Sequence, residues 1–263
     1  MVITIENCSS PGAHFSKNTN LVLQKIHEWI IKNEKPELPF IEFRRRLEKE
    51  AKINDNNARN IYPLLKNGGL VEYHPGEKLA SGSFFTKRGL AYLKALETKD
   101  MIMHGDYTKK QKEEASVQVD EIMGSIVCDS LKKLLKNKEL NYSESLRWYL
   151  LFLAKYKKIN KQEFALMVYT MNQDAENWQA NIDTIIQQYR KQEIDIEVKV
   201  RIRNDTKDHQ STDEKTRVED ISYFTAYGYY SGLINQAGLT KKVKNYFFVN
   251  EDKIDKIDYL LEV

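Results

Sequence analysis

The chain has 263 residues, enough for two domains that each bury a core of their own. Hydrophobic residues make up 41% of it and charged residues 30%, which is typical of a globular protein and excludes a fibrous or low-complexity chain. Its 41 Lys and Arg nearly balance its 38 Asp and Glu, for a formal net charge of +3. Any affinity for nucleic acid must therefore come from where the cations lie, because the overall charge is too small to supply it.

Residues 1–19 predict an N-terminal arm, because they are polar and contain Pro11 and Gly12. They lack the basic region and apolar run of a signal peptide. The two cysteines, Cys8 and Cys128, lie far apart, and the five histidines lack metal-ligand spacing, which predicts reduced thiols and no metal site. No apolar run approaches the roughly 20 residues that span a bilayer. We therefore expect a cytoplasmic protein.

Residues 20–98 predict a compact helical domain that contains a β-ribbon. Asn20 is the expected N-cap of its first helix, and Gly68-Gly69 is expected to end the third. Two short strands, LVEYH and SFFTK, enclose the polar turn PGEKLASG, and a closing amphipathic helix follows. Apolar residues at helical spacing place the helices at residues 21–33, 40–52, 53–67 and 87–97.

The remaining chain predicts a connector and a second domain. Residues 99–140 carry one long helical pattern and are expected to join the two domains, so the second domain covers residues 141–263. It opens with a strongly apolar helix, and Asn160 is expected to cap the next one. Asn172 or Asp174 is expected to start a third helix, the alternating residues 194–203 a strand, and a charged loop lies near 203–218.

One order of elements occurs twice in the sequence. A helix stops at a Gly-Leu pair, Gly69-Leu70 or Gly238-Leu239, and a short ribbon and a closing helix follow. A winged helix-turn-helix has this order and presents one exposed helix and one hairpin to the groove of a duplex. We therefore predict a mainly α fold with small β-ribbons, in which tandem winged helix-turn-helix domains are joined by a helical connector.

The predicted DNA contacts are polar side chains on the helix before each Gly-Leu pair and cations near the ribbons. Asn, Gln and Arg on such a helix pair with base edges, and Lys and Arg bind phosphates with salt-sensitive affinity. The alternative for each residue is a helix cap or an ordinary solvated surface. In the first domain the candidates are Arg44, Arg45, Asn56, Asn57, Arg59, Asn60, Lys66, Lys87 and Arg88; in the second they are Tyr223, Thr225, Tyr227, Lys241, Lys242 and Lys244.

Glu197 and Lys199 define an alternative hypothesis, an intact Mg²⁺-dependent nuclease. Nucleases of the PD-(D/E)xK type place Glu and Lys two apart on a strand, and an upstream Asp completes the metal site. Here the upstream Asp174 and Asp183 lie in a segment with helical periodicity, where such a site needs a strand. A charged strand face produces the same spacing, so no catalytic residue is assigned. A winged-helix transcriptional regulator is the other alternative.

The chain resembles the DNA-recognition region of type IIS restriction endonucleases (FokI- and AlwI-type). The resemblance covers most of residues 20–263 and rests on FTKRGLAYLKALE, LRWYLLFLAKYKKINKQEF and YYSGLINQAG, together with the tandem order of elements. It implies sequence-specific binding of double-stranded DNA, for which a monomer suffices when the site is asymmetric. It also implies a nuclease domain or subunit as a partner, with Mg²⁺ as the cofactor of that nuclease and no cofactor in this chain. The DNA contacts that it implies are Asn57, Arg59 and Asn60, and Tyr223, Thr225, Tyr227, Lys242 and Lys244.

Overall fold

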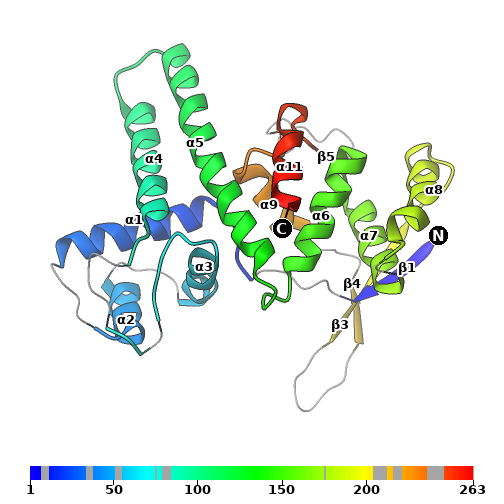
Figure 1. Cartoon of the computed structure of the whole chain (residues 1–263), viewed down its shortest axis with the longest axis horizontal. Coiled ribbons are helices and arrows are strands. Elements are labelled where there is room, and N and C mark those ends of the chain that lie inside the picture. Colours follow the sequence, from blue (N-terminus) through cyan, green and yellow to red (C-terminus); the bar gives the residue numbers. More distant parts are fainter. Residues whose placement is uncertain are drawn as a thin grey trace. The chain divides into compact units, whose positions relative to one another are not determined.

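The computed structural model is mainly helical with two small sheets, as the sequence predicts (Figure 1). It describes residues 1–6, 12–33, 38–50, 55–74, 76–78, 84–174, 176–203, 212–215, 221–235 and 246–262. Contacts divide the chain into two compact units. The N-terminal unit comprises Pro11–Leu140, Ala226–Leu233 and Glu262–Val263, and the C-terminal unit comprises Met1–Ser10, Asn141–Thr225 and Ile234–Leu261. Among the described residues, no helix is both long and apolar enough to cross a bilayer.

The N-terminal unit is built from amphipathic helices that bury one face each. The first begins four residues before the expected position, because Ser16 caps it through a hydrogen bond from the Thr19 amide to the Ser16 hydroxyl at 3.1 Å. Asn20 instead lies inside this helix, where its side-chain oxygen accepts a hydrogen bond from the Tyr92 hydroxyl at 3.0 Å. The helices are α1 (Lys17–Lys32), α2 (Phe40–Glu50), α3 (Asp55–Asn67), α4 (Lys87–His104) and α5 (Lys109–Lys136).

Two antiparallel bridges connect the segments around α2 and α3. Val71 pairs with Phe85 after α3, at the position of the predicted ribbon, and Pro39 pairs with Lys78 just before α2. Aromatic rings pack beneath these bridges: the Phe40 ring is stacked on the Tyr73 ring with 3.8 Å between centroids. The ribbon is shorter than predicted, because its described part consists of bridges and no continuous strand.

Residues 99–140 form part of the N-terminal unit, where the sequence predicted a connector. α4 continues to His104, and α5 starts again after Thr108, whose capping box with Gln111 fixes the start of the helix. α5 packs back along α4 and also contacts α3 (Figure 1). The apolar stripe of α5 must be covered, and packing within the unit covers it. Its buried members include Val119, Met123, Val127, Leu131 and Leu134.

The C-terminal unit begins with two helices around a two-residue strand. Asn160 caps the second helix as predicted, because its side-chain oxygen accepts a hydrogen bond from the Glu163 amide at 2.8 Å. The third helix starts later than expected, since Asp174 ends the preceding helix and accepts a hydrogen bond from the Asn177 amide at 3.0 Å. These elements are α6 (Ser143–Tyr156), β2 (Lys158–Ile159), α7 (Lys161–Gln173) and α8 (Trp178–Arg190).

The expected N-terminal arm contains a strand, β1 (Val2–Glu6), that lies parallel to β3 (Glu197–Arg203). β3 is the strand that the sequence predicted at residues 194–203. Its other edge pairs in an antiparallel direction with β4 (Thr212–Lys215), which lies within the charged loop expected near 203–218. Ile3 and Ile5 of β1 are buried, and β1 contacts α7. Ile3 and Ile5 lie on the same face of β1, because side chains alternate along a strand. Burial of this face against a helix explains why β1 belongs to the C-terminal unit.

The second helix-to-ribbon transition lies six residues before the predicted one. α9 (Ile221–Tyr230) ends ahead of Gly232-Leu233, where Gly232 has φ +75° and the Leu233 amide donates to the Gly228 carbonyl at 2.8 Å. The first transition has the same geometry, with φ +72° at Gly69 and a 2.8 Å bond from the Leu70 amide to the Leu65 carbonyl. Gly238-Leu239, to which the sequence assigned this role, lies outside the described residues.

A short antiparallel ribbon follows this second transition. Ile234 forms a bridge with Val249, and β5 (Phe247–Phe248) pairs with β2. A 3₁₀ turn, η1 (Glu251–Lys253), leads into the closing helix α11 (Ile254–Leu261), which packs on α6. The order of helix, ribbon and closing helix in this part therefore follows the sequence expectation, with the turn between its strands outside the described residues.

Candidate nucleic-acid interface

α3 carries the predicted base-contacting residues of the N-terminal unit. Its inner face is buried, and Asn60 is exposed. Lys66 is half-buried, with its ammonium nitrogen 4.9 Å from the centre of the Tyr73 ring. The described surface of α3 thus includes the amide of Asn60 and the ammonium group of Lys66. The side chains of Asn56, Asn57 and Arg59 lie outside that described set.

The predicted cations of α2 and α4 differ in how they are paired. Arg44 lies 3.3 Å from Glu48, and Arg88 lies 3.4 Å from Asp129, so part of their charge is already compensated. Arg45 and Lys87 are exposed, and neither forms an ion pair with a described residue. Unpaired surface cations can bind phosphate without first breaking a contact, so Arg45 and Lys87 are better candidates for phosphate contacts than Arg44 and Arg88.

The predicted contacts on α9 are largely wrong. Thr225 is 3% exposed, and its hydroxyl donates to the Ile221 carbonyl at 2.7 Å. Tyr227 is completely buried, and its hydroxyl donates to the Ala13 carbonyl at 3.0 Å. Polar atoms that are satisfied inside the protein are unavailable to DNA, and sequence patterns carry no signal of these backbone partners. Tyr223 is half-exposed, while Lys241, Lys242 and Lys244 lie outside the described residues.

Glu197 and Lys199 lie on β3 with the predicted alternation, since Val198 between them is buried. Neither upstream carboxylate lies on a strand. Asp174 ends α7, and Asp183 on α8 accepts hydrogen bonds from the Lys155 ammonium at 2.7 Å and from the Tyr156 hydroxyl, which lower its pKa. Within the described part of the chain, no group of three or more His, Cys, Asp or Glu side chains could hold a metal ion. We therefore assign no nuclease centre to these residues.

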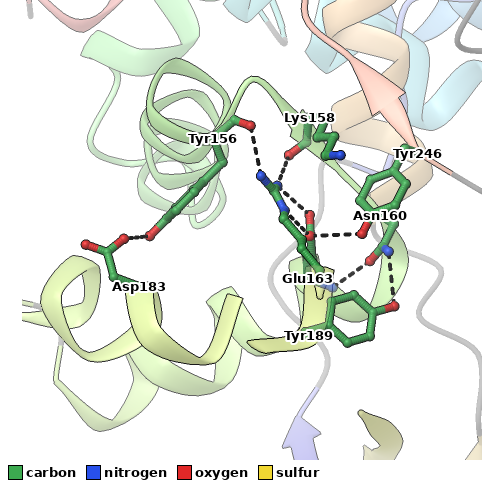
Figure 2. A network of polar contacts seen from close by, with 8 residues as sticks. Tyr156, Lys158, Asn160, Glu163, Asp183, Tyr189 and Tyr246 are labelled. Atoms are coloured by element: carbon green, nitrogen blue, oxygen red, sulfur yellow. Dashed lines mark hydrogen bonds and ion pairs between the residues drawn. The ribbon is translucent and has the colours of Figure 1, made fainter. Parts of the chain in front are cut away.

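A buried ion pair between α7 and α8 is the main polar feature that sequence reasoning missed (Figure 2). Glu163 has no exposed surface, and its two carboxylate oxygens accept from Arg190 Nε at 2.7 Å and from an Arg190 terminal nitrogen at 3.1 Å. Arg190 also donates to the Tyr156 carbonyl at 3.2 Å and to the Lys158 carbonyl at 2.9 Å. The pair thus ties the end of α8 to the chain between α6 and α7.

Tyrosines complete this network on the side of the ribbon. The Tyr246 hydroxyl donates to the Glu163 carboxylate at 3.2 Å. Burial is the larger cause that raises the pKa of Tyr246, and the nearby Glu163 carboxylate raises it further. The Asn160 side-chain amide donates to the Tyr189 hydroxyl at 3.1 Å. A cavity of roughly 460 Å³ opens beside these groups, and it is lined in part by Lys158, Arg190, Tyr189, Tyr246, Glu193 and Asp195. Because the cavity lining carries both signs of charge, it does not select an anion.

Four lysines follow one another over the segment that this network holds. We call residues 155–161 the lysine turn; it joins α6 to α7 through β2. Lys155 pairs with Asp183, whereas Lys157 and Lys161 are exposed and form no ion pair with a described residue. The Lys158 ammonium lies 4.7 Å from the centre of the Tyr246 ring and 6.0 Å from that of Phe248. The C-terminal unit therefore has a cationic surface at a position where the sequence analysis predicted no DNA contact.

Comparisons of this chain with family models, with curated proteins and with solved structures find no match.

Proposed function

We propose that the chain binds double-stranded DNA sequence-specifically, as the target-recognition module of a type IIS restriction endonuclease. One observation carries the proposal. α3 ends at the left-handed Gly69, an antiparallel bridge leads from there back into α4, and the exposed Asn60 lies on α3. A helix followed directly by a ribbon, with an amide on its outer face, suits insertion into the major groove.

The order of elements around α3 supports this proposal. α1, the extended bridge at Pro39, α2, α3, the Val71–Phe85 bridge and α4 follow one another in the N-terminal unit, which is the order of a winged helix-turn-helix. In the C-terminal unit, β2 pairs with β5, and the next residue after β5 pairs with Ile234. A short antiparallel ribbon thus follows the Gly232-Leu233 transition in the chain and precedes the closing helix α11.

Charge and chemistry at the surface fit the two tasks of such a module. Arg45 and Lys87 are exposed cations for phosphate contacts, which position a protein on DNA. Asn60 is exposed on the same helix as Asn56, Asn57 and Arg59, and amide and guanidinium groups are the side chains that read adenine and guanine edges. A nuclease domain or subunit, with its Mg²⁺, would supply the cleavage that this module directs.

Selection of binding sites from a random duplex library tests the proposal with the full chain. We expect enrichment of one asymmetric sequence, and an affinity for it that falls steeply with salt because phosphate contacts release counterions. Fluorescence anisotropy of the selected and a scrambled duplex at two salt concentrations gives the specificity ratio. Absence of any salt-dependent affinity for duplex would refute DNA binding.

Incubation of plasmid with Mg²⁺ and the purified chain separates this proposal from the nuclease hypothesis. A recognition module alone leaves the plasmid intact. Cleavage that is lost in Glu197→Ala and retained in Glu144→Ala, which removes an exposed carboxylate on α6, would instead favour an intact nuclease centred on β3.

A further inference from the structure

We infer that the lysine turn of the C-terminal unit binds the sugar–phosphate backbone of duplex DNA, through Lys157, Lys158 and Lys161. This inference rests on the proposed function and adds a second contact surface to it. Because Thr225 on the C-terminal unit's part of α9 is buried and Tyr223 is only half-exposed, that unit needs a further surface if it is to hold DNA firmly. The lysine turn is the described part of that unit in which unpaired cations are densest.

The charge of these lysines is uncompensated. Lys157, Lys158 and Lys161 form no ion pair with a described carboxylate, whereas Lys155 is bound to Asp183 at 2.7 Å. The nearest acid in sequence, Glu163, is buried and already engaged by Arg190. Two rings hold the Lys158 ammonium, so its charge stays in place without a carboxylate partner. Three such cations within five residues suit a run of phosphates.

The backbone under these lysines is fixed on both sides. The Lys157 amide donates to the Leu153 carbonyl at 3.0 Å, and the Lys157 carbonyl accepts from the Val249 amide at 2.9 Å. The Lys158 carbonyl accepts from Arg190 at 2.9 Å (Figure 2). A surface that is ordered before binding loses less conformational entropy when a ligand arrives, which favours this segment over a mobile basic loop.

The neighbouring cavity indicates where the ligand lies. Glu193 and Asp195 line the cavity together with Lys158 and Arg190, so a phosphate inside it would meet two carboxylates. Lys157 and Lys161 are exposed and do not line the cavity. The backbone of a duplex, which is too large to enter the cavity, would contact these lysines from outside.

The salt dependence of duplex binding by the full chain tests this inference. The variant Lys157→Asn/Lys161→Gln removes two charges, and asparagine is chosen because Lys157 has φ +63°, a conformation that Asn tolerates. The matched control is Lys109→Gln/Lys110→Gln, whose lysine side chains are 92% and 86% exposed on α5 and pair only weakly with Glu113 and Glu114 at 3.8 Å. Both variants lose two positive charges, so a difference in their salt dependence must come from where the lysines lie on the protein.

The plot of log association constant against log salt concentration has a negative slope. We expect this slope to become shallower by about 1.8 in the lysine-turn variant, at roughly 0.9 for each lost phosphate contact, and to stay unchanged in the control. Lys161→Gln alone, expected to lower the slope by about 0.9, replaces the double variant if that variant does not fold. Equal slopes in wild type and lysine-turn variant would overturn the inference and leave the proposed function standing. If the wild type shows no salt-dependent duplex binding, the proposed function fails as well. Loss of binding to phosphatidylserine vesicles with duplex binding unchanged would assign the turn to a membrane and also overturn the inference.

Discussion

At the scale of single residues, the ion pair of Glu163 and Arg190 joins α8 to α7 and to the chain between α6 and α7. Glu163 is fully buried, and Arg190 joins it to two backbone carbonyls of the chain between α6 and α7. Burying two charges is costly, and the hydrogen bonds of both groups offset much of that cost. The value of the pair is therefore positional, because it fixes the segment on which the lysine turn lies.

Removing one partner of this pair should be far worse than removing both. Arg190→Met leaves the Glu163 carboxylate buried with only Tyr246 and loses two bonds to carbonyls, so we expect a loss of about 3–5 kcal/mol in the free energy of unfolding. The double variant Glu163→Leu/Arg190→Met should be the more stable of the two. Urea unfolding followed by circular dichroism measures both. A double variant less stable than Arg190→Met would contradict the view that the buried, unpaired Glu163 carboxylate causes the loss of stability.

Gly89 provides a residue-scale test of the fold around the ribbon. It lies in the first turn of α4, and a β-carbon built there would be 1.9 Å from the Leu70 carbonyl oxygen, on the residue after the left-handed Gly69. Helix propensity alone predicts that Gly89→Ala stabilises the protein by about 1 kcal/mol. We expect the opposite sign, a loss of about 1–3 kcal/mol or more, because the backbone of Leu70 cannot move aside easily.

Thermal unfolding of Gly89→Ala is compared with that of Gly76→Ala. Gly76 has φ +92° with nothing within 4 Å of its added β-carbon, so this control carries backbone strain without a clash. A Gly89→Ala protein more stable than wild type would mean that α4 does not lie against Leu70 as described.

At the scale of elements, sequence periodicity predicted the positions of the helices well and the burial of their polar faces poorly. The stripes of α1, α2 and α3 were found where expected, and Asn160 caps α7. The burial of α9 was not predictable, because its tyrosine and threonine side chains satisfy their polar atoms with backbone carbonyls inside the protein. Periodicity reports which face is apolar, but it cannot report that the polar face is also covered.

Variants of α3 and α4 distinguish base contacts from phosphate contacts. Asn60→Ala should cost about 1–3 kcal/mol in binding at the selected site and little at a scrambled one, because an amide reads base edges. Lys87→Ala should weaken binding to both duplexes alike and lower the salt slope by about 1. Anisotropy titrations with both duplexes measure the two effects. Equal losses on both duplexes for Asn60→Ala would remove α3 from base recognition.

At the scale of the whole molecule, the two units are not consecutive stretches of chain. Met1–Ser10 belongs to the C-terminal unit, and Ala226–Leu233 belongs to the N-terminal unit. The sequence predicted contiguous domains, because local patterns carry no record of pairing between residues nearly 200 positions apart. The pairing of Val2 with Glu197 is such a contact, and the bond from the Cys128 thiol to the Ser231 carbonyl at 3.4 Å joins residues 103 positions apart.

The number of chains on one DNA site decides between a recognition module and a transcriptional regulator. Each chain already holds two candidate contact surfaces, one on α3 and one on the lysine turn, so one chain of 30.9 kDa can engage an asymmetric site without a partner of the same kind. Sedimentation velocity of the chain with a twofold excess of the selected duplex should therefore give a one-to-one complex, at protein concentrations well above the dissociation constant. A regulator of the winged-helix class would instead bind palindromes as a dimer, because two half-sites mirror a twofold axis. Two chains per duplex together with a palindromic selected site would favour that alternative and remove the argument for a restriction-type recognition module.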